Sequence, residues 1–429
     1  MRIAVVGSGI SGMASAWLLS QDHEVTLYEA GSHVGGHTHT HDVHQDGVHY
    51  AVDSGFIVFN GEHYPLLTAL FARLGVASQP TTMSFAVQNG GTGLEYNAAS
   101  LDGLFCQRRN LLSPRFLGMV RDLLRFYREA PALLGQPQDT QSLGQYLAQR
   151  GYGAAFRDDH LVPMASALWS SPPRQILNFP VRYLVQFMAN HQMLRAGTRP
   201  QWRVVSGGSQ TYVRALRSQW DVDERVGCGV IAVRRHPQAV ELRHRFGIEN
   251  FDQVVMACHS DETLALLDAS ESERAVLGAI GYQANDVVLH TDARLLPRSR
   301  KAWAAWNAYI PAAPDAACTV SYCMNLLQGI ESREPFIVTL NRSEAIEPAK
   351  VLRRLQYRHP EYSVASVAAQ RRKSEIQGQR RTWFAGAYWG WGFHEDGMRS
   401  AVDVAEGLGS NAAHRLLGTR AAPAAAVAA

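Results

Sequence analysis

The residues of this 429-residue chain that point most clearly to chemistry are three glycines near its start, Gly7, Gly9 and Gly12. They follow the short apolar run Arg2–Val6 and precede a segment of helical composition. Gly7 permits a tight turn, Gly9 lets the backbone approach a phosphate, and Gly12 lets the helix pack closely on its strand. Free N–H groups at the start of that helix attract a pyrophosphate. The spacing therefore predicts a dinucleotide site.

An acidic residue follows where the ribose of a dinucleotide requires one. Glu29 lies 17 residues after Gly12 and ends a second apolar run, Glu24–Tyr28. A carboxylate at this place accepts hydrogen bonds from ribose hydroxyls. The order of strand, glycine loop, helix, strand and acid supports the dinucleotide site more strongly than the glycines alone. We expect no secretory signal, because glycines and serines interrupt the first apolar run.

Composition and charge exclude several other classes of protein. The net charge is +3, which is too small to indicate a nucleic-acid partner by itself. The five cysteines form no CxxC motif, so we expect no zinc site, no disulfide framework and a cytoplasmic location. His37, His39 and His41 alternate along the chain, but few carboxylates lie near them. We favour a structural or cofactor-adjacent role for these histidines and expect no metal.

The elements that must position these residues recur along the chain. Runs typical of buried parallel strands occur at the start, at Gln253–Ala257 and at Trp383–Ala387. Residues 101–200 show helical spacing, and residues 283–345 contain strand patterns. This order predicts an α/β fold with two discontinuous domains and a ligand cleft between them.

We predict the domain boundaries from these runs. A Rossmann-like dinucleotide-binding domain is expected from 1–75, 205–282 and 378–420, and a substrate-binding domain with helices and a mixed or antiparallel sheet from 76–204 and 283–377. The alanine-rich end, 421–429, is expected to be disordered.

Several motifs together resemble the flavin amine oxidase and phytoene desaturase superfamily. They are GSGISG at 7–12, Glu29, the double glycine at 35–36, Asp-x-Gly at 53–55, QVVMACHSDETLALL at 253–267 and WFAGAYWGWGFHEDGMRSAV at 383–402. The last segment and DVVLHTDARLLP at 286–297 resemble one subgroup of predicted NAD/FAD-binding oxidoreductases. That subgroup is often encoded beside cyclopropane-fatty-acid-synthase-type methyltransferases.

The resemblance implies a bound FAD and assigns roles to individual residues. Contacts to the pyrophosphate, ribose, ribityl chain and adenine fall to Gly7, Gly9, Ser11, Gly12, Glu29, Gly35, Gly36, Thr38 and Val230. Gly55 also belongs to the cofactor site, and Gly386 is the close-approach glycine of the final strand. Asp396, Gly397 and Met398 begin a last helix whose N-terminus faces the flavin pyrimidine. A helix N-terminus there stabilises the negative charge of reduced flavin.

The chain departs from the superfamily pattern at two places. His37 stands where members usually have arginine after the double glycine, so it could contact phosphate or carry a covalent flavin link. We expect the FAD to be non-covalent. Amine oxidases usually carry a lysine on a strand of the substrate domain, and the comparable run 283–291 has none. This difference argues against amine oxidation.

The densest chemical segment is 388–395, between the last strand and the last helix. Tyr388, Trp389 and Trp391 are expected to line an apolar pocket beside the flavin, although packing at a domain interface is the simpler alternative. His394 and His290 are the candidate acid or base residues. Dehydrogenation by a flavin needs a base only if the second hydrogen is acidic, so the sequence need not show one.

We therefore predict an FAD-dependent oxidoreductase that desaturates an apolar substrate, a modified fatty acyl chain, by hydride transfer to flavin N5. The first alternative is an amine or amino-acid oxidase, with Arg174, Arg182 or Arg203 as carboxylate anchor. The second is a non-catalytic FAD-binding accessory protein of a lipid methyltransferase. The helical segment 111–134 could contact a membrane peripherally, but packing on the core is the preferred interpretation.

Overall fold

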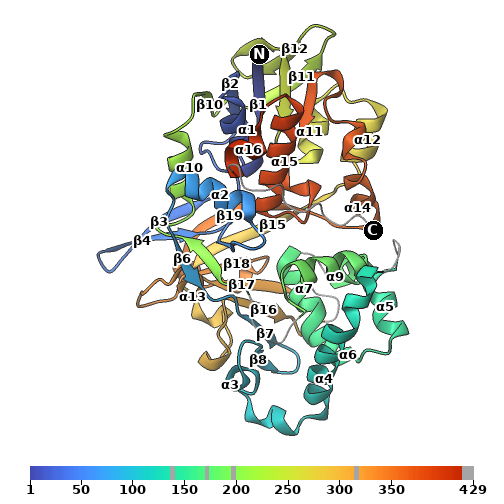
Figure 1. Ribbon diagram of the computed structural model, residues 1–429. Helices are drawn as coiled ribbons and strands as arrows, with labels where there is room; N and C mark the ends of the chain where they lie inside the picture. Colours follow the sequence, from blue (N-terminus) through green and yellow to red (C-terminus); the bar gives the residue numbers. More distant parts are fainter. Residues whose placement is uncertain (136–140, 170–172, 195–199, 314–317, 418–429) are drawn as a thin grey trace.

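The computed structural model describes residues 1–135, 141–169, 173–194, 200–313 and 318–417. The predicted disordered end, 421–429, lies outside these residues. A parallel sheet with its helices forms one end of the molecule, and a second sheet with a group of helices forms the other (Figure 1). The chain thus has an α/β fold.

The parallel sheet has five strands in the order β10-β2-β1-β14-β20. Every pair in it is parallel. Its central strands are buried on both faces, which explains why their sequences are continuous apolar runs. The strands span Arg2–Val6 (β1), Glu24–Glu29 (β2), Val222–Val226 (β10), Gln253–Met256 (β14) and Thr382–Phe384 (β20).

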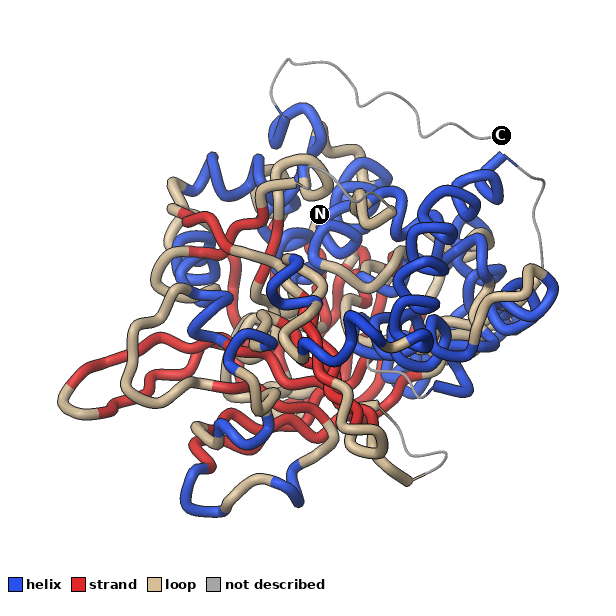
Figure 2. Tube along the Cα trace, turned by 90° about the horizontal axis from the view of Figure 1, so that it is seen from below, coloured by secondary structure: helices blue, strands red, loops and turns tan. Residues whose placement is uncertain are grey.

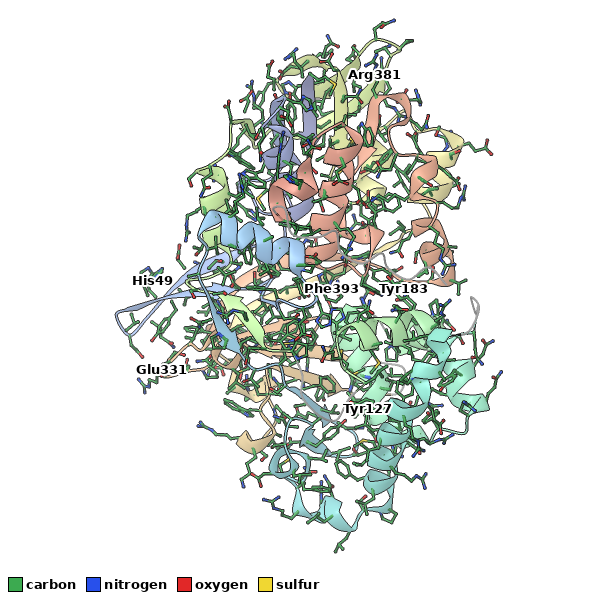
Figure 3. All side chains as sticks on the ribbon, viewed as in Figure 1. His49, Tyr127, Tyr183, Glu331, Arg381 and Phe393 are labelled. Atoms are coloured by element: carbon green, nitrogen blue, oxygen red, sulfur yellow. The ribbon has the colours of Figure 1, made fainter. Side chains whose placement is uncertain are left out.

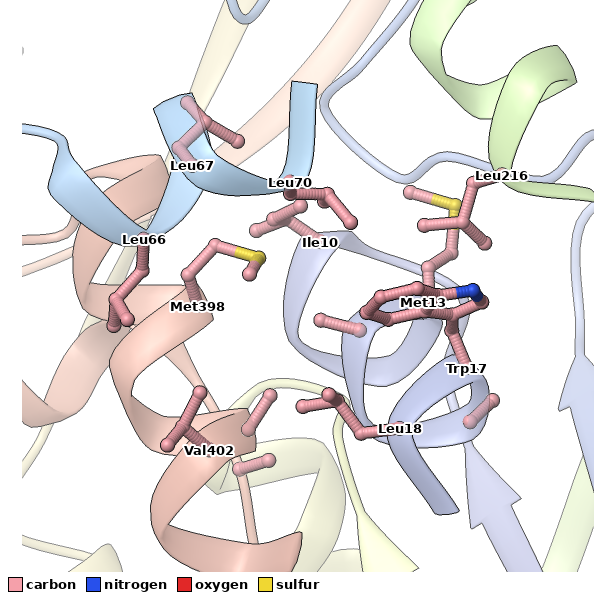
Figure 4. Packing of buried hydrophobic residues seen from close by; sticks show 14 of the residues in the cluster. Ile10, Met13, Trp17, Leu18, Leu66, Leu67, Leu70, Leu216, Met398 and Val402 are labelled. Carbon is pink, nitrogen blue, oxygen red and sulfur yellow. The ribbon is translucent and has the colours of Figure 1, made fainter. Parts of the chain in front are cut away.

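The first helix is enclosed by later parts of the chain. All ten residues of α1 (Ile10–Leu19) are buried. It packs against α15 (His394–Gly407) and α2 (Pro65–Leu74), where Ile10, Leu70 and Met398 meet (Figure 4). A Cβ on Gly397 would lie 2.7 Å from Ile10 Cγ2, so this glycine allows α1 and α15 to approach closely.

The second sheet has seven strands in the order β19-β15-β18-β17-β16-β7-β8. Only β16 and β7 pair in parallel, so the sheet is mixed. Its strands span Phe85–Asn89 (β7), Glu95–Asn97 (β8), Tyr282–His290 (β15), Trp306–Ile310 (β16), Thr319–Cys323 (β17), Ile337–Leu340 (β18) and Val351–Pro360 (β19).

A group of helices lies beside this sheet. Figure 2, seen from below, shows helices gathered on one side of the crossing strands. The helices are α3 (Leu101–Leu104), α4 (Pro114–Glu129), α5 (Leu143–Gln149), α6 (Ala154–Phe156), α7 (Val162–Trp169), α8 (Pro173–Asn178) and α9 (Val181–Asn190). Short 3-10 turns, η1 (Arg108–Leu112) and η5 (Arg300–Ala302), lie near α3 and the start of α4.

The remaining elements are small sheets and short helices. Three short sheets contain β3 (Thr40–Gln45) with β4 (Val48–Asp53), β5 (Val58–Phe59) with β9 (Trp202–Val205) and β6 (Ser78–Thr81), and β11 (Val230–Arg235) with β12 (Val240–His244) and β13 (Gly247–Phe251). The remaining helices are α10 (Gln210–Arg217), α11 (Ser260–Leu266), α12 (Glu271–Leu277), α13 (Met324–Gln328), α14 (Val364–Gln370) and α16 (Ala412–Leu417).

The structure differs from the sequence-based expectation in two elements. The ten-residue strand β19 was not predicted, since arginines and a histidine obscure its alternation. The last helix begins at His394, two residues before Asp396, the first of the three residues predicted to begin it. Within the described ranges, no helix is long and apolar enough to cross a membrane.

Candidate functional site

A cavity of about 1010 Å³ runs between the two ends of the molecule. One end is lined by the glycine loop after β1, including Gly7, Gly9 and Ser11. The other end reaches α4, α7 and α9. Phe393 and Tyr183, labelled in Figure 3, lie at the level where the upper and lower parts of the molecule meet.

The glycine loop leaves space where a phosphate is expected. A Cβ built on Gly9 would meet no atom within 4 Å, and Gly9 lines the cavity. The backbone of Gly36 crosses directly behind it, because a Cβ on Gly36 would lie 2.9 Å from Gly9 Cα. Gly9 and Gly36 therefore place two backbone segments side by side at the cavity wall, as a bound diphosphate requires.

The other predicted glycines act through backbone packing. A Cβ on Gly12 would lie 1.8 Å from Gly7 O, and one on Gly55 would lie 2.0 Å from His37 O. Gly7 has φ +103°, a backbone conformation that residues with a side chain rarely adopt. Gly12 and Gly35 are not among the cavity-lining residues; Gly35 donates its N–H to Ser8 O at 3.1 Å. These glycines shape the loop.

Glu29 ends β2 and lines the cavity. Its carboxylate accepts hydrogen bonds from the N–H of Ser8 at 3.1 Å and of Gly31 at 2.6 Å. These donors fix the carboxylate beside the glycine loop. Val230, at the start of β11, and Gly386 also line the cavity.

Three histidines from distant elements line the cavity near this loop. The ring of His37 lies 6.0 Å from that of His259 and 5.5 Å from that of His359, between centroids. Burial lowers the pKa of His37 and of His259 to about 4 and that of His359 to about 3. Among the residues that the structure describes, His37 Nε2 and His259 Nδ1 have no hydrogen-bond partner. They are donors or acceptors available to a ligand.

His394 lines the cavity from the first turn of α15. Its Nε2 lies 3.0 Å from Thr38 Oγ1 and 3.2 Å from Tyr212 Oη. Its ring stacks on Phe56. Burial lowers the pKa of His394 to about 3, so the ring is neutral at physiological pH. Thr38 itself does not line the cavity; its hydroxyl holds His394 and Tyr212 in place.

The start of α15 differs from its predicted form. Asp396 lies within the helix and accepts hydrogen bonds from the N–H groups of Trp391 and Phe393, each at 3.0 Å. Burial raises the pKa of Asp396 to about 6. Gly397 and Met398 pack against α1 and are not among the cavity-lining residues. His394, rather than these two residues, is the part of the helix that faces the cavity.

The three aromatic residues proposed for the pocket separate in the structure. Tyr388 and Trp391 line the cavity. Trp389 is not among the lining residues; its Nε1–H donates to Phe384 O at 3.1 Å, and Lys373 lies over its ring. Trp389 is therefore a packing residue, because its indole turns toward β20.

His290 does not lie at the cavity. It is fully buried in β15, its Nε2 lies 2.7 Å from Thr339 Oγ1, and its Nδ1 accepts the N–H of Asp292 at 3.0 Å. Both ring nitrogens are therefore engaged within the protein. His290 has no access to a ligand in the cavity, so it is not placed to act as the acid or base that the sequence suggested.

The far end of the cavity is mostly apolar and aromatic, although His160 and His191 also line it. Its lining residues there include Met83, Phe85, Tyr127, Met164, Leu168, Trp169, Phe187, Met193, Trp202, Trp306 and Tyr322. Among the described lining residues, the only carboxylates are Glu29 and Glu262, both on the nucleotide-binding sheet and its helices. Arg174, Arg182 and Arg203 are absent from this lining.

Sequence reasoning missed several cavity residues. Cys258 and His259 follow the carboxyl end of β14, where ligand sites of parallel sheets lie, so their position was a usable signal. Tyr357 and His359 come from the unpredicted strand β19, and no local pattern marks them. Over the same described ranges, no group of three or more His, Cys, Asp or Glu residues could hold a metal ion.

Comparison with known proteins places this geometry in a family. The model of the family "Flavin containing amine oxidoreductase" matches residues 10–301. A zeta-carotene desaturase from a Synechocystis strain is 38% identical over 97 residues. That match covers 22% of this chain and 19% of the desaturase, so it does not carry over an activity.

Two solved structures share the fold along nearly the whole chain. A CLA-producing fatty acid isomerase from P. acnes has a TM-score of 0.65 and 16% identity, covering 94% of this chain and 98% of that one. Putrescine oxidase bound to putrescine has a TM-score of 0.67 and 13% identity, covering 95% and 99%. At these identities the likeness shows the fold alone.

The residues at the glycine loop fit FAD. The open space at Gly9, the paired backbone at Gly36 and the fixed carboxylate of Glu29 supply a phosphate cradle and a ribose acceptor. Since the family model matches well over half of the residues, the chain belongs to the flavin containing amine oxidoreductase family and is an FAD-dependent oxidoreductase.

Proposed function

We propose that this oxidoreductase dehydrogenates an apolar substrate, a modified fatty acyl chain. The observation that carries the proposal is the uncharged far end of the cavity, with residues such as Met164, Leu168 and Trp169. An ammonium group buried there would have no side-chain carboxylate beside it among the described lining residues, and burying an unpaired charge is costly. An acyl chain gains free energy from the same surface.

The chain's own residues bind and orient such a substrate. Trp391 and Phe393 line the cavity between the glycine loop and the apolar end, and Asp396 holds their backbone in place. His394 is neutral and fixed, so it presents a polar edge without a charge. When bound, FAD supplies the hydride acceptor for the oxidation.

Anaerobic stopped-flow measurement of flavin reduction tests the proposal. Detergent-solubilised acyl lipids, including methyl-branched ones, are expected to bleach the flavin, whereas putrescine and simple amino acids are not. Leu168→Asp, which introduces a carboxylate into the apolar end, should slow reduction by lipid at least tenfold. Leu326→Asp, at an exposed leucine on α13, is the matched control and should change nothing.

Two results contradict the proposal and favour an alternative. Rapid bleaching by an amine with none by any lipid would favour an amine oxidase. A flavin that no substrate reduces, but that dithionite reduces, would favour an accessory protein.

A further inference from the structure

An unusual surface lies at the end of the molecule farthest from the parallel sheet. Figure 1 shows α3 and the lower end of α4 at this extremity, opposite the N-terminus. Five exposed leucines occur within 24 residues of the sequence, on α3, η1 and α4: Leu101, Leu111, Leu112, Leu117 and Leu124. We call this surface the leucine tip. Single exposed leucines are ordinary, but a cluster marks an interaction surface.

The exposed leucines are not scattered at random. Leu112 is 87% exposed and Leu101 is 77% exposed, so these side chains are almost fully in solvent. On α4, Leu117 and Leu124 alternate with the exposed Arg121 and Arg128 at helical spacing, which forms one stripe. The opposite face of α4 is buried through Phe116, Met119 and Phe126. The helix is thus packed on the core by one face and still presents leucines on the other.

The charge around the leucine tip is strongly positive. Residues 101–129 contain six arginines, two aspartates and one glutamate, a net charge of +3 that equals the total of the chain. Asp102 pairs with Arg108, Asp122 with Arg121 and Glu129 with Arg125, but the arginines outnumber these acids. Exposed leucines beside this excess of arginine are complementary to a surface that is both apolar and anionic.

The cavity reaches the elements that carry the leucine tip. Tyr127 of α4 lines it, and so do Ala98 and Ala99, which directly precede α3. Figure 3 shows Tyr127 in the lower part of the molecule, on the side of this tip. The apolar end of the cavity and the leucine tip are therefore built on the same two segments of chain.

We propose that the leucine tip docks on the surface of an anionic phospholipid bilayer and that apolar substrate enters the cavity from there. The leucines insert among the acyl chains near the headgroups, and the arginines contact lipid phosphates. The docking is inferred from the exposed leucines and arginines alone, whereas substrate entry also rests on the proposed function. No spanning helix is involved, so the contact is peripheral and weakens with salt.

Vesicle flotation tests the docking. The holoenzyme is expected to float with vesicles that contain phosphatidylglycerol, to float weakly with phosphatidylcholine alone, and to lose binding at high salt. The pair Leu112→Ser and Leu117→Ser should weaken binding at least tenfold. The matched control is Phe246→Ser with Ile248→Ser, two exposed apolar residues on the β12–β13 hairpin, and it should float as the wild type does.

Charge is tested with a second pair of variants. Arg121→Gln with Arg128→Gln should weaken binding to the anionic vesicles about 25-fold, or about fivefold for each arginine, and leave the weak binding to phosphatidylcholine unchanged. Arg234→Gln with Arg243→Gln, exposed on β11 and β12, is the control. A wild type that stays in the lipid-free fraction, or leucine-tip variants that float normally, would overturn the proposal.

Two further measurements separate the remaining explanations. If sedimentation without lipid shows an oligomer that the leucine pair dissociates, and the wild type does not float, the tip is a contact between copies and the proposal is wrong. Substrate entry predicts that the leucine pair slows flavin reduction by lipid in vesicles but not by the same lipid in detergent. Failure of the proposed function would instead abolish reduction in both, while flotation would persist.

Discussion

The imidazole ring of His394 stacks on the phenyl ring of Phe56, with centroids 3.6 Å apart and an angle of 17° between the planes. The stack joins the first residue of α15 to the segment between β4 and β5. Because Thr38 and Tyr212 hold Nε2 of the same ring, His394 is fixed on both its face and its edge. It is therefore a rigid part of the cavity wall, and its chemical role depends on its being neutral.

We expect His394→Ala to lower the free energy of unfolding by about 2 kcal/mol, through loss of the stack and of one hydrogen bond. Urea denaturation checks this value. The pKa of His394 is held at about 3, so its ring does not titrate near neutrality. The rate of flavin reduction in the wild type and in His394→Gln should therefore show the same pH dependence between pH 6 and 8. A step near pH 6.5 that vanishes in the variant would contradict this assignment.

Gly9→Val and Gly12→Val should fail in different ways. A side chain at Gly9 enters open cavity, so the variant should fold but lose its FAD. A Cβ at Gly12 would lie 1.8 Å from Gly7 O, so that variant should not fold. Flavin absorbance and circular dichroism measure the two properties. Gly118→Val, at a glycine of α4 with open space around it, is the control for tolerance of valine in place of glycine. Full flavin content in Gly9→Val would disprove the phosphate site.

Glu29→Ala should weaken FAD binding by about 1–3 kcal/mol, the range for hydrogen bonds to a charged group. The carboxylate also fixes the N–H groups of Ser8 and Gly31, so the glycine loop loses support at the same time. Isothermal titration of the apoprotein with FAD gives the dissociation constant. Glu24→Ala, at the exposed start of the same strand, should leave that constant unchanged.

Stability should fall in mild acid. Burial holds the pKa values of His37, His259 and His359 at about 3 to 4, below the ordinary 6.5. Between these values the unfolded chain binds protons that the folded chain does not, so stability is complete above pH 6.5 and declines as the pH falls toward 4. Each such histidine contributes a slope of about 1.4 kcal/mol per pH unit.

Denaturation midpoints at pH 5 and pH 7 measure this effect. His359→Asn should show a smaller loss between the two pH values than the wild type, because one proton uptake is removed. The buried carboxyl of Asp396, whose pKa is raised to about 6, acts in the opposite direction, so the difference between the variant and the wild type is the informative quantity. The same loss in both proteins would show that the His359 ring is charged in the folded protein.

Trp391→Ala and Trp389→Ala should separate binding from packing. Trp391 lines the cavity, so its removal should raise KM for the substrate more than it lowers stability. Trp389 packs toward Phe384 and lies outside the lining, so its removal should cost about 3 kcal/mol of stability and leave KM unchanged. Steady-state kinetics and thermal denaturation distinguish the two, and equal KM effects would contradict the assignment.

The glycine loop and Glu29 could be predicted because their signals are local. Turn, helix start and acid follow one another within about one supersecondary unit, and each has a residue type that its geometry demands. The misplaced start of α15 has a physical cause. Asp396 caps the helix from inside its first turn by accepting the N–H of Phe393, so the acid that resembled a helix start lies two residues beyond the true start.

The rest of the cavity could not be predicted in the same way. Tyr357 and His359 reach the cavity only because β19 pairs with β15, and that pairing joins segments some 70 residues apart. The alternation of β19 is masked because the consecutive residues Arg353 and Arg354 are both exposed. Which side chains meet across the cavity is decided by tertiary packing, and no short pattern encodes it.

The contact between α1 and α15 limits when the newly synthesised chain can fold. Helix α1 is synthesised well before the residues that enclose it, and Met398 follows it by more than 370 residues. Strand β20, which completes the parallel sheet, is equally late. Throughout translation the apolar α1 therefore remains without its final neighbour, which exposes the nascent protein to aggregation. Loss of residues 378–417 would remove β20 and α15 and leave the glycine loop after β1 without a stable support.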